Sequence, residues 1–223
     1  MSRAIIYWKK KVIKTGNACP NVSLFRLLND LNFNYKRKKV LELGFGHGAD
    51  IIEFKKRGSE VYGIDINKNA VQDLKSKLKI KNLKINDCSD QKKFFGNTKF
   101  DLIYNRDFIY YFSNNKIKKL KKNVYNNLKL NGLYIFQYIE NDMQIDDLKS
   151  ETTEIGGNLF KKYKNKKFSE KDNPVRFLKF RNLYNVALKI GFKYLGKKLL
   201  IESYGINEEK LRINRYLIFC KKF

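Results

Sequence analysis

The sequence has 223 residues, of which 43% are hydrophobic, and this suffices for one domain with a substantial core. No apolar run approaches the ~20 residues that a membrane-spanning helix needs. The N-terminal segment also lacks the apolar stretch of a secretory signal. Three scattered cysteines without a CxxC pair argue against a zinc site and a disulfide framework, and they favour a cytoplasmic protein.

The net charge of +26 suggests an anionic partner, but lysine far outnumbers arginine, and asparagine, isoleucine, tyrosine and phenylalanine are also abundant. An AT-rich coding bias produces this combination and spreads lysine over every solvated face. We therefore interpret the charge mainly as a compositional bias. The alternative is a functional anionic partner, such as an anionic saccharide, a nucleic acid or a lipid surface.

In chain order, the predicted elements begin with an N-terminal region at residues 4–35, which contains one helix. Alternating strands and helices follow. Strands are predicted at 40–43, 60–64, 83–85, 100–104 and 133–139. Helices are predicted at 50–57, after the capping residue Asn67, and along an apolar stripe at 117–128 that the Asn131–Gly132 pair closes. This alternation implies right-handed crossovers and a parallel sheet covered on both faces.

After Glu140 the alternation stops, and residues 141–181 are polar and rich in lysine. We expect this segment to form a basic insertion or lid. A helix at 182–190 and two strands follow, at 192–201 and 215–223, and the short link between the strands favours an antiparallel pair. The predicted fold is α/β: a Rossmann-like, seven-stranded, mostly parallel sheet with helices on both faces and an antiparallel closing strand pair.

The most informative stretch is KVLELGFGHGAD at 39–50, where a strand meets Gly44, Gly46 and Gly48 and a helix follows. Glycines at alternate positions allow a sharp turn and let a ligand approach the backbone. Three interpretations fit this stretch. It could bind a dinucleotide, since G-x-G-x-x-G/A is satisfied and the acidic Asp65 ends the next strand. It could bind S-adenosylmethionine, whose ribose needs the same acid, or it could merely pack a helix on a strand.

Three acidic residues favour S-adenosylmethionine over a dinucleotide. Glu42, inside the first strand, suits the cationic amino group of a bound amino acid and does nothing for a pyrophosphate. Asp50 occupies the first turn of the following helix, where a phosphate would otherwise bind. Asp87 ends the third strand, where it would accept an adenine amino group. The antiparallel closing pair is also unlike an all-parallel dinucleotide sheet.

Residues 39–140 resemble the core of the class I S-adenosylmethionine-dependent methyltransferases. The segments that carry the resemblance are LELGFGHG at 41–48, GIDIN at 63–67, NDCSD at 86–90, FDLIYNRDFIYYF at 100–112, LKLNGLYIF at 128–136 and IGFK at 190–193. Their order and spacing are far more specific than any single motif. Phe45 and Asn131 depart from the family's usual small residue and proline.

The resemblance implies S-adenosylmethionine as the cofactor and no metal. Asp65 would accept hydrogen bonds from both ribose hydroxyls. Ile66 would pack on the adenine face, and Cys88 would flank its edge beside Asp87. The expected cofactor-binding residues are Glu42, Gly44, Phe45, Gly46, Gly48, Asp65, Ile66, Asp87, Cys88 and Asn105.

Methyl transfer is an in-line displacement on an already activated sulfonium carbon, so the protein mainly supplies alignment and desolvation. A base helps only where the acceptor must lose a proton. The candidate catalytic residues are Asp107, His47, Arg106, Tyr110 and Tyr111. The first two are candidate bases, although His47 could instead pack in the turn or contact the cofactor. Arg106 would hold an acidic acceptor or the cofactor carboxylate, and the tyrosines would bind the substrate or merely cover the pocket.

The fourth-strand motif YNRD lacks the (D/N)PP(Y/F) pattern and the Pro-Cys pair of several nucleic-acid and protein methyltransferases. We therefore predict a single methyltransferase domain over residues 1–223, with a cap region at 1–35, that methylates O or N of a small molecule or surface sugar. An anionic acceptor is one option. The alternatives are an RNA methyltransferase with a basic lid, which is not favoured, an NAD-binding Rossmann protein and an inactive binding module. No oligomeric state is predicted.

Overall fold

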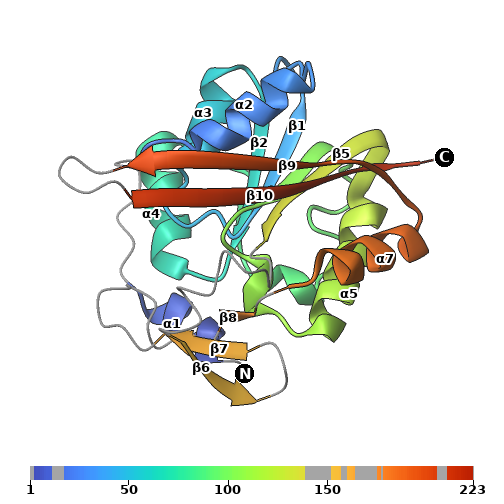
Figure 1. The fold of residues 1–223 in the computed structure, drawn as a ribbon. Coiled ribbons are helices and arrows are strands. Elements are labelled where there is room, and N and C mark those ends of the chain that lie inside the picture. The colour runs from blue at the N-terminus through green and yellow to red at the C-terminus, as the bar shows by residue number, and fades with distance from the viewer. Residues whose placement is uncertain are drawn as a thin grey trace.

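The computed structural model describes residues 3–11, 18–138, 152–156, 160–163, 175–176, 178–204 and 210–222. A seven-stranded sheet with the order β3-β2-β1-β4-β5-β10-β9 forms its centre (Figure 1). The strands are β1 (Lys39–Leu43), β2 (Glu60–Asp65), β3 (Leu83–Ile85), β4 (Phe100–Asn105), β5 (Leu128–Tyr138), β9 (Phe192–Tyr204) and β10 (Lys210–Lys221). β10 runs antiparallel to both β5 and β9, and the other neighbouring pairs are parallel. The mostly parallel sheet with an antiparallel closing pair is thus confirmed.

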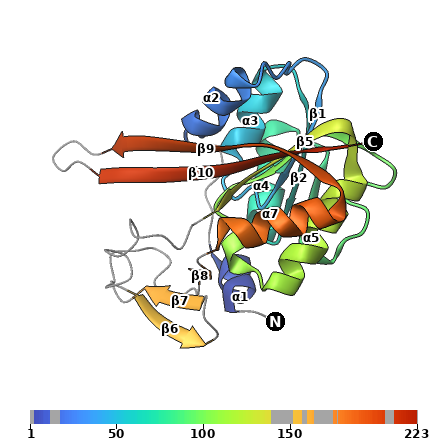
Figure 2. The same cartoon turned by 45° about the vertical axis from the view of Figure 1, so that its right-hand side comes forward.

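Helices cover both faces of this sheet, as Figure 2 shows. On one face lie α2 (Val22–Asp30), α3 (Ala49–Lys56) and α4 (Lys68–Leu78). On the other lie α5 (Asn114–Asn127) and α7 (Phe180–Ile190), together with the short helices η1 (Cys88–Asp90) and η2 (Ile109–Tyr111). Because both faces are covered, the central strands are apolar on both sides.

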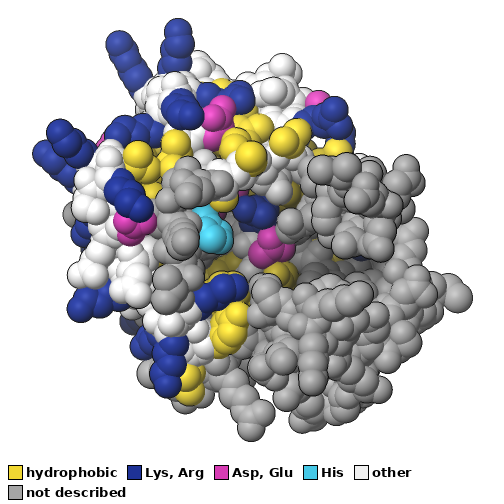
Figure 3. Space-filling view, turned by 90° about the vertical axis from the view of Figure 1, so that its left-hand side faces the viewer, with side chains coloured by type: hydrophobic (Ala, Val, Ile, Leu, Met, Phe, Trp, Pro, Cys, Tyr) yellow, Lys and Arg dark blue, Asp and Glu magenta, His cyan; other side chains and the backbone are white. Residues whose placement is uncertain are grey.

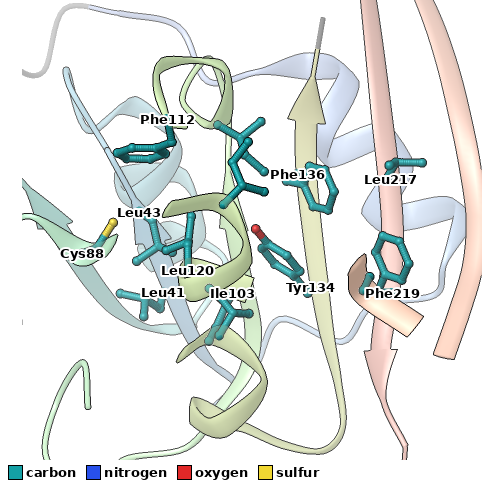
Figure 4. Packing of buried hydrophobic residues seen from close by; sticks show 14 of the residues in the cluster. Leu41, Leu43, Cys88, Ile103, Phe112, Leu120, Tyr134, Phe136, Leu217 and Phe219 are labelled. Atoms are coloured by element: carbon teal, nitrogen blue, oxygen red, sulfur yellow. The ribbon is translucent and has the colours of Figure 1, made fainter. Parts of the chain in front are cut away.

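Successive side chains of each central strand enter opposite cores, as the two-residue period of a strand requires. In β1, Leu41 packs with Leu120 of α5 on one face, whereas Val40 packs with Phe54 of α3 on the other. Figure 4 shows the first of these cores, in which side chains of β1, β4, β5 and β10 meet those of α5. The alternating burial fixes the register of the parallel strands and therefore the edge at which they all end.

Helix ends follow their capping residues closely. The side chain of Asn67 accepts a hydrogen bond from the backbone N–H of Ala70 and starts α4, and Asn21 does the same for α2 through Leu24. Gly191 ends α7 in the left-handed region, at φ +111°.

One boundary differs from the sequence-based prediction. The apolar stripe was expected to remain helical to Leu128 and to close at Asn131–Gly132, but α5 ends at Asn127 and Leu128 is already extended, with ψ 148°. β5 therefore starts before the Asn131–Gly132 pair. Asn131 adopts φ +58°, and the pairing of β5 with β4 shifts register between Phe100 and Leu102. The local turn is absorbed as an irregularity inside a strand because Leu128 pairs with Phe100 across the sheet.

Two segments lie beside the carboxyl ends of the parallel strands. The helix α1 (Arg3–Lys10), which the sequence did not predict, lies at the same end of the molecule as a small antiparallel sheet (Figure 1). That sheet comprises β6 (Thr152–Gly156), β7 (Phe160–Tyr163) and β8 (Val175–Arg176), and Arg176 donates a hydrogen bond of 2.8 Å to Asn114. Most of the predicted basic lid at 141–181 falls outside the described residues, as do Ile139 and Phe223 of the predicted strands. No helix among the described residues is long and apolar enough to cross a membrane.

Candidate active site

The glycine turn after β1 owes its shape to three residues with positive φ: Gly44, Gly46 and Gly48. A Cβ at Gly44 would overlap the ring of Phe108, and one at Gly48 would come within 2.6 Å of Leu74. A Cβ at Gly46 would meet no atom within 4 Å, so open space lies beside that backbone. The outer two glycines are therefore needed for close packing, whereas the middle one leaves room for a ligand.

This open space belongs to a cavity of about 340 Å³ at the carboxyl ends of the strands. Its size is within the range of small-molecule sites. Figure 3 shows the hollow, with the histidine (cyan) beside acidic and basic side chains. The predicted residues that line the cavity are Glu42, Gly44, Phe45, Gly46, His47, Gly48, Asp65, Ile66, Asp87, Cys88, Arg106, Asp107 and Tyr111. The carboxylates of Glu42, Asp65 and Asp87, which were predicted to bind the cofactor, thus line one cavity.

Glu42 lies on the buried floor of this cavity and accepts a hydrogen bond of 2.6 Å from the Tyr104 hydroxyl. Burial, and then the charge of Asp50, raise the pKa of Glu42 well above its ordinary value, although the hydrogen bond from Tyr104 opposes this. A carboxylate in such surroundings gains most from a cationic ligand, because the cation offsets the cost of burying its charge.

Asp65, at the end of β2, holds the glycine turn. One of its oxygens accepts a hydrogen bond of 2.8 Å from the N–H of Gly46, and the other accepts one of 2.8 Å from the N–H of Asn67. Burial raises the pKa of Asp65, and these backbone hydrogen bonds limit the rise. Because a carboxylate oxygen accepts more than one hydrogen bond, both oxygens can still accept from hydroxyl groups in the cavity.

Asp87 follows β3 and lies where the cavity meets α5. Its carboxylate accepts hydrogen bonds from the hydroxyl and the backbone N–H of Ser89 and from Lys116, at 2.7, 3.0 and 3.1 Å. Partial burial raises its pKa, but these partners outweigh that effect and leave the pKa of Asp87 below its ordinary value. Burial, Asp87 and Asp65 raise the pKa of the neighbouring Cys88 thiol well above its usual range, so this cysteine packs as a neutral side chain.

Arg106, directly after β4, forms ion pairs with two carboxylates. Its Nε lies 3.3 Å from the buried Asp50 and its Nη1 lies 3.1 Å from the more exposed Asp107. Burial lowers the pKa of Arg106, but Asp50 and Asp107 more than offset this and raise it above its ordinary value. Asp50 also accepts the N–H of Asn21 at 2.6 Å. With these partners, Asp50 fills the N-terminal turn of α3, where a pyrophosphate would otherwise bind.

Known proteins match this chain both in sequence and in structure. The family model described as "Methyltransferase domain" matches residues 40–132. The phosphoethanolamine N-methyltransferase of Plasmodium falciparum (isolate 3D7) is 29% identical over 190 residues, which cover 83% of this chain and 68% of that protein. The chain therefore contains a methyltransferase domain, and its fold is that of the class I S-adenosylmethionine-dependent methyltransferase family.

Two solved structures of methyltransferases illustrate the shared fold. An S-adenosylmethionine-dependent methyltransferase from Methanosarcina mazei has a TM-score of 0.72 at 14% identity, over 87% of this chain and 97% of that one. The magnesium protoporphyrin IX methyltransferase of Synechocystis PCC 6803, with bound S-adenosylhomocysteine, has a TM-score of 0.63 at 16% identity, over 90% of this chain and 81% of that one.

The cavity of this methyltransferase fits S-adenosylmethionine, the cofactor of the family. The ligand combines a cationic amino acid end with an adenosine and has no phosphate. Glu42 would hold the amino end, Asp65 the ribose hydroxyls and Asp87 the adenine side, with Gly46 leaving the space between them. When bound, the cofactor supplies a methyl group on a positively charged sulfur.

Two predicted residues lie differently. Asn105 does not line the cavity: its side chain is buried behind the wall and donates a hydrogen bond of 3.1 Å to the hydroxyl of Tyr134. Tyr110 does not line the cavity either, but its hydroxyl donates to Asp107 at 3.4 Å. Asn105 is the last residue of β4, and its side chain enters the core that contains Tyr134. In this part of the chain the cavity is lined by residues that follow β4, such as Arg106 and Asp107.

The methyltransferase cavity also has walls that sequence motifs did not identify. Phe108 and Phe112 flank Tyr111 on the loop after β4, and Trp8 and Lys11 come from α1 and the residue after it. The Lys11 ammonium lies 4.7 Å from the centre of the Trp8 ring. The run of aromatic residues at 108–112 could have indicated this wall from the sequence. Lys11 could not be singled out, because the chain has 48 lysines and arginines. Among the described residues, no group of three or more His, Cys, Asp or Glu could hold a metal ion.

Proposed function

We propose that this enzyme transfers the methyl group of S-adenosylmethionine to a nitrogen or oxygen of a small acceptor that carries an anionic group, and that an amine suits the site best. The observation that carries the proposal is the pairing of Asp107 and Lys11 on the walls of one cavity. A carboxylate and an ammonium at two places in one pocket complement an acceptor with a cationic and an anionic end. A cytoplasmic location belongs to this proposal, because the scattered free cysteines suit a reducing compartment.

The amine side of the proposal depends on the surroundings of Asp107. This residue adopts φ +48°, and strained backbone of this kind concentrates at functional sites. Its carboxylate accepts hydrogen bonds from Arg106 and Tyr110. Its backbone N–H donates to the side-chain oxygen of Gln137. Aromatic side chains at 108, 111 and 112 line the neighbouring wall and favour a cationic or partly desolvated amine over its hydrated form. Asp107 would accept the proton that the amine releases as its bond to carbon forms.

The anionic side of the proposal depends on Lys11. Its ammonium lies over two aromatic rings, at 4.7 Å from the centre of Trp8 and 5.4 Å from that of Tyr7. These contacts limit the positions that the side chain can take, and a fixed ammonium loses less entropy when it binds an anion. The Plasmodium falciparum relative is named for phosphoethanolamine, a molecule with one amine and one phosphate, and this supports an acceptor of the same chemical kind.

A methyl-transfer screen tests the proposal. Purified enzyme would be incubated with tritiated-methyl S-adenosylmethionine and, separately, with phosphoethanolamine, ethanolamine, neutral sugars, sugar phosphates and total RNA. We expect incorporation into an amine or hydroxyl that carries a phosphate or carboxylate, and much less into its uncharged analogue. Incorporation into RNA alone would replace this proposal with the alternative of a nucleic-acid substrate.

Two variants give the screen its structural control. Lys11→Met should raise the KM for the charged acceptor by about tenfold or more, the factor of one charge-assisted hydrogen bond, and leave the KM of the uncharged analogue unchanged. The matched control is Lys10→Met, which removes the exposed ammonium of the preceding residue, the last of α1. Equal KM values for both variants would show that Lys11 does not hold the acceptor.

A further inference from the structure

Asn67 links the cofactor side of the cavity to α1. The residue is fully buried, and its backbone N–H donates to Asp65 at 2.8 Å. Its side-chain oxygen caps α4 through Ala70 at 2.9 Å. Its side-chain nitrogen donates two hydrogen bonds in the opposite direction, of 2.6 Å to the carbonyl of Trp8 and 2.7 Å to the carbonyl of Lys11. Every polar group of this side chain is therefore used, and it joins two segments that lie 56 to 59 positions apart.

The carbonyls that Asn67 binds belong to the carboxyl end of α1. The last carbonyls of a helix have no partner within the helix, so they need side chains or water. α1 has eight residues and is too short to be stable on its own in water. Its position therefore depends on contacts with the rest of the fold. Besides Asn67, these include the edge-on packing of Trp8 against Tyr111, with ring centres 6.0 Å apart.

We infer that Asn67 is a positioning residue that couples the cofactor site to the acceptor wall. A ligand bound at Asp65 stabilises the turn at residues 65–67, and Asn67 then stabilises the docked position of α1, which carries Trp8 and is followed directly by Lys11. The inference rests on the proposed function, since it uses the proposed roles of Asp65 and of the wall on α1. Coupling of this kind is reciprocal, so docking of α1 also strengthens cofactor binding.

The sequence offers a direct probe, because Trp8 is the only tryptophan in the chain. Its fluorescence and its quenching by acrylamide report on α1 alone. We would measure both with and without S-adenosylhomocysteine for the wild type, Asn67→Asp and Asn67→Ser. Aspartate keeps the size and the capping oxygen but cannot donate to the two carbonyls, and serine keeps the cap but is too short to reach them. The backbone N–H that serves Asp65 remains in both variants.

The matched control is Asn21→Ser, the same substitution at the residue that caps α2. In the wild type and in the control, S-adenosylhomocysteine should lower the quenching of Trp8. In both Asn67 variants Trp8 should be more accessible without ligand, the ligand should change its quenching little, and the dissociation constant for the ligand should rise at least about fivefold. A loss of global stability alone would affect Asn21→Ser as well, and therefore would not produce this difference.

Either of two results would overturn the inference: Asn67 variants in which the ligand still protects Trp8 as in the wild type, or a wild-type protein in which the ligand leaves Trp8 unchanged. Because no methyl acceptor enters these measurements, their outcome is separate from that of the proposed reaction. A failed acceptor screen with intact coupling would refute only the proposed acceptor, and an active acceptor with no coupling would refute only the role of Asn67.

Discussion

Tyr104 donates a hydrogen bond of 2.6 Å to Glu42, and the two residues face each other across the pairing of β1 with β4. Both side chains are buried. The bond favours the ionised form of Glu42, whereas burial and Asp50 favour the protonated form and prevail. The charge on the cavity floor therefore depends on pH in a range where ordinary carboxyl groups stay ionised.

Cofactor affinity should accordingly fall as the pH is lowered. The ionised form of Glu42 attracts the amino group of the ligand, and a raised pKa means that this form is lost at a higher pH than for an exposed glutamate. We expect the affinity for S-adenosylhomocysteine, measured by calorimetry between about pH 5 and 8, to decrease toward the acid end. Glu42→Gln should bind more weakly at pH 8 and show a flatter profile.

Tyr104→Phe tests the same relationship in the other direction. Removing the hydroxyl removes an interaction that lowers the pKa of Glu42, so the loss of affinity should begin at a higher pH than in the wild type. Identical profiles for the wild type and Glu42→Gln would show that another group controls binding.

The two acidic partners of Arg106 should have different roles. Asp50 is 1% exposed and Asp107 is 37% exposed at the side chain, although both contact the same guanidinium. Asp50→Asn leaves a mostly buried cation without its closest buried partner, and we expect a loss of about 2–4 kcal/mol in the free energy of unfolding. Asp107→Asn removes a screened pair and should cost less than about 1 kcal/mol.

The effect of Asp107→Asn on activity should be large, although its effect on stability is small. If Asp107 accepts the proton of the acceptor, Asp107→Asn should lower kcat by about 10²-fold or more while the protein stays folded. Urea unfolding and single-turnover methyl transfer on both variants would check this. A large stability loss in Asp107→Asn with unchanged turnover would contradict both assignments.

The glycine turn offers a third comparison. Gly44→Ala should destabilise the fold, because its Cβ would overlap the ring of Phe108 and its φ is +75°. Gly46→Ala places its Cβ in open space at φ +50°, so its stability cost should be near the ~1 kcal/mol of a left-handed alanine. That Cβ lies beside the ligand space, and cofactor affinity should fall in a protein that remains folded. Thermal unfolding and calorimetry on the two variants separate these effects, and an unchanged affinity in Gly46→Ala would show that the ligand does not approach this backbone.

Most of the cavity could be predicted from the sequence, because the sheet topology brings the predicted strand ends together. Glu42, Asp65, Asp87 and Asp107 belong to the ends of four neighbouring parallel strands or to the loops after them, and the carboxyl ends of parallel strands meet at one edge. Strand alternation and glycine spacing are local signals, so they could be read without knowing the fold. Asn105 was assigned to the cavity because it also lies at such an end, but its side chain faces the core.

The acceptor wall on α1 was harder to predict because its causes are not local. α1 has only eight residues, and two hydrogen bonds from the distant Asn67 hold its carboxyl end. The sequence indicated a cap containing Trp8, but neither a helix nor Lys11. The early start of β5 was missed for the same reason, since the pairing of Leu128 with Phe100 across the sheet decides where that strand begins.

A buried lysine provides the last prediction. Lys121 of α5 is completely buried, donates a hydrogen bond of 2.6 Å to the carbonyl of Leu183 and lies 4.7 Å from the centre of the Phe136 ring. Burial lowers the pKa of Lys121 from 10.5 to about 7. Above that pH the native state lacks a proton that the unfolded chain still binds, so the free energy of unfolding should rise with pH up to the unfolded pKa.

The slope that Lys121 contributes should be about 1.4 kcal/mol per pH unit between about pH 7.5 and 9, and Lys121→Met should remove it. Urea unfolding at several pH values would measure the slope, with Lys122→Met as the control, because Lys122 is the exposed neighbour on the same helix. The control should keep the wild-type slope, since its ammonium is hydrated in both states. At pH 6, Lys121→Met should be more stable than the control, because no charge then has to be buried. Equal slopes in the two variants would mean that Lys121 keeps its proton in the folded protein.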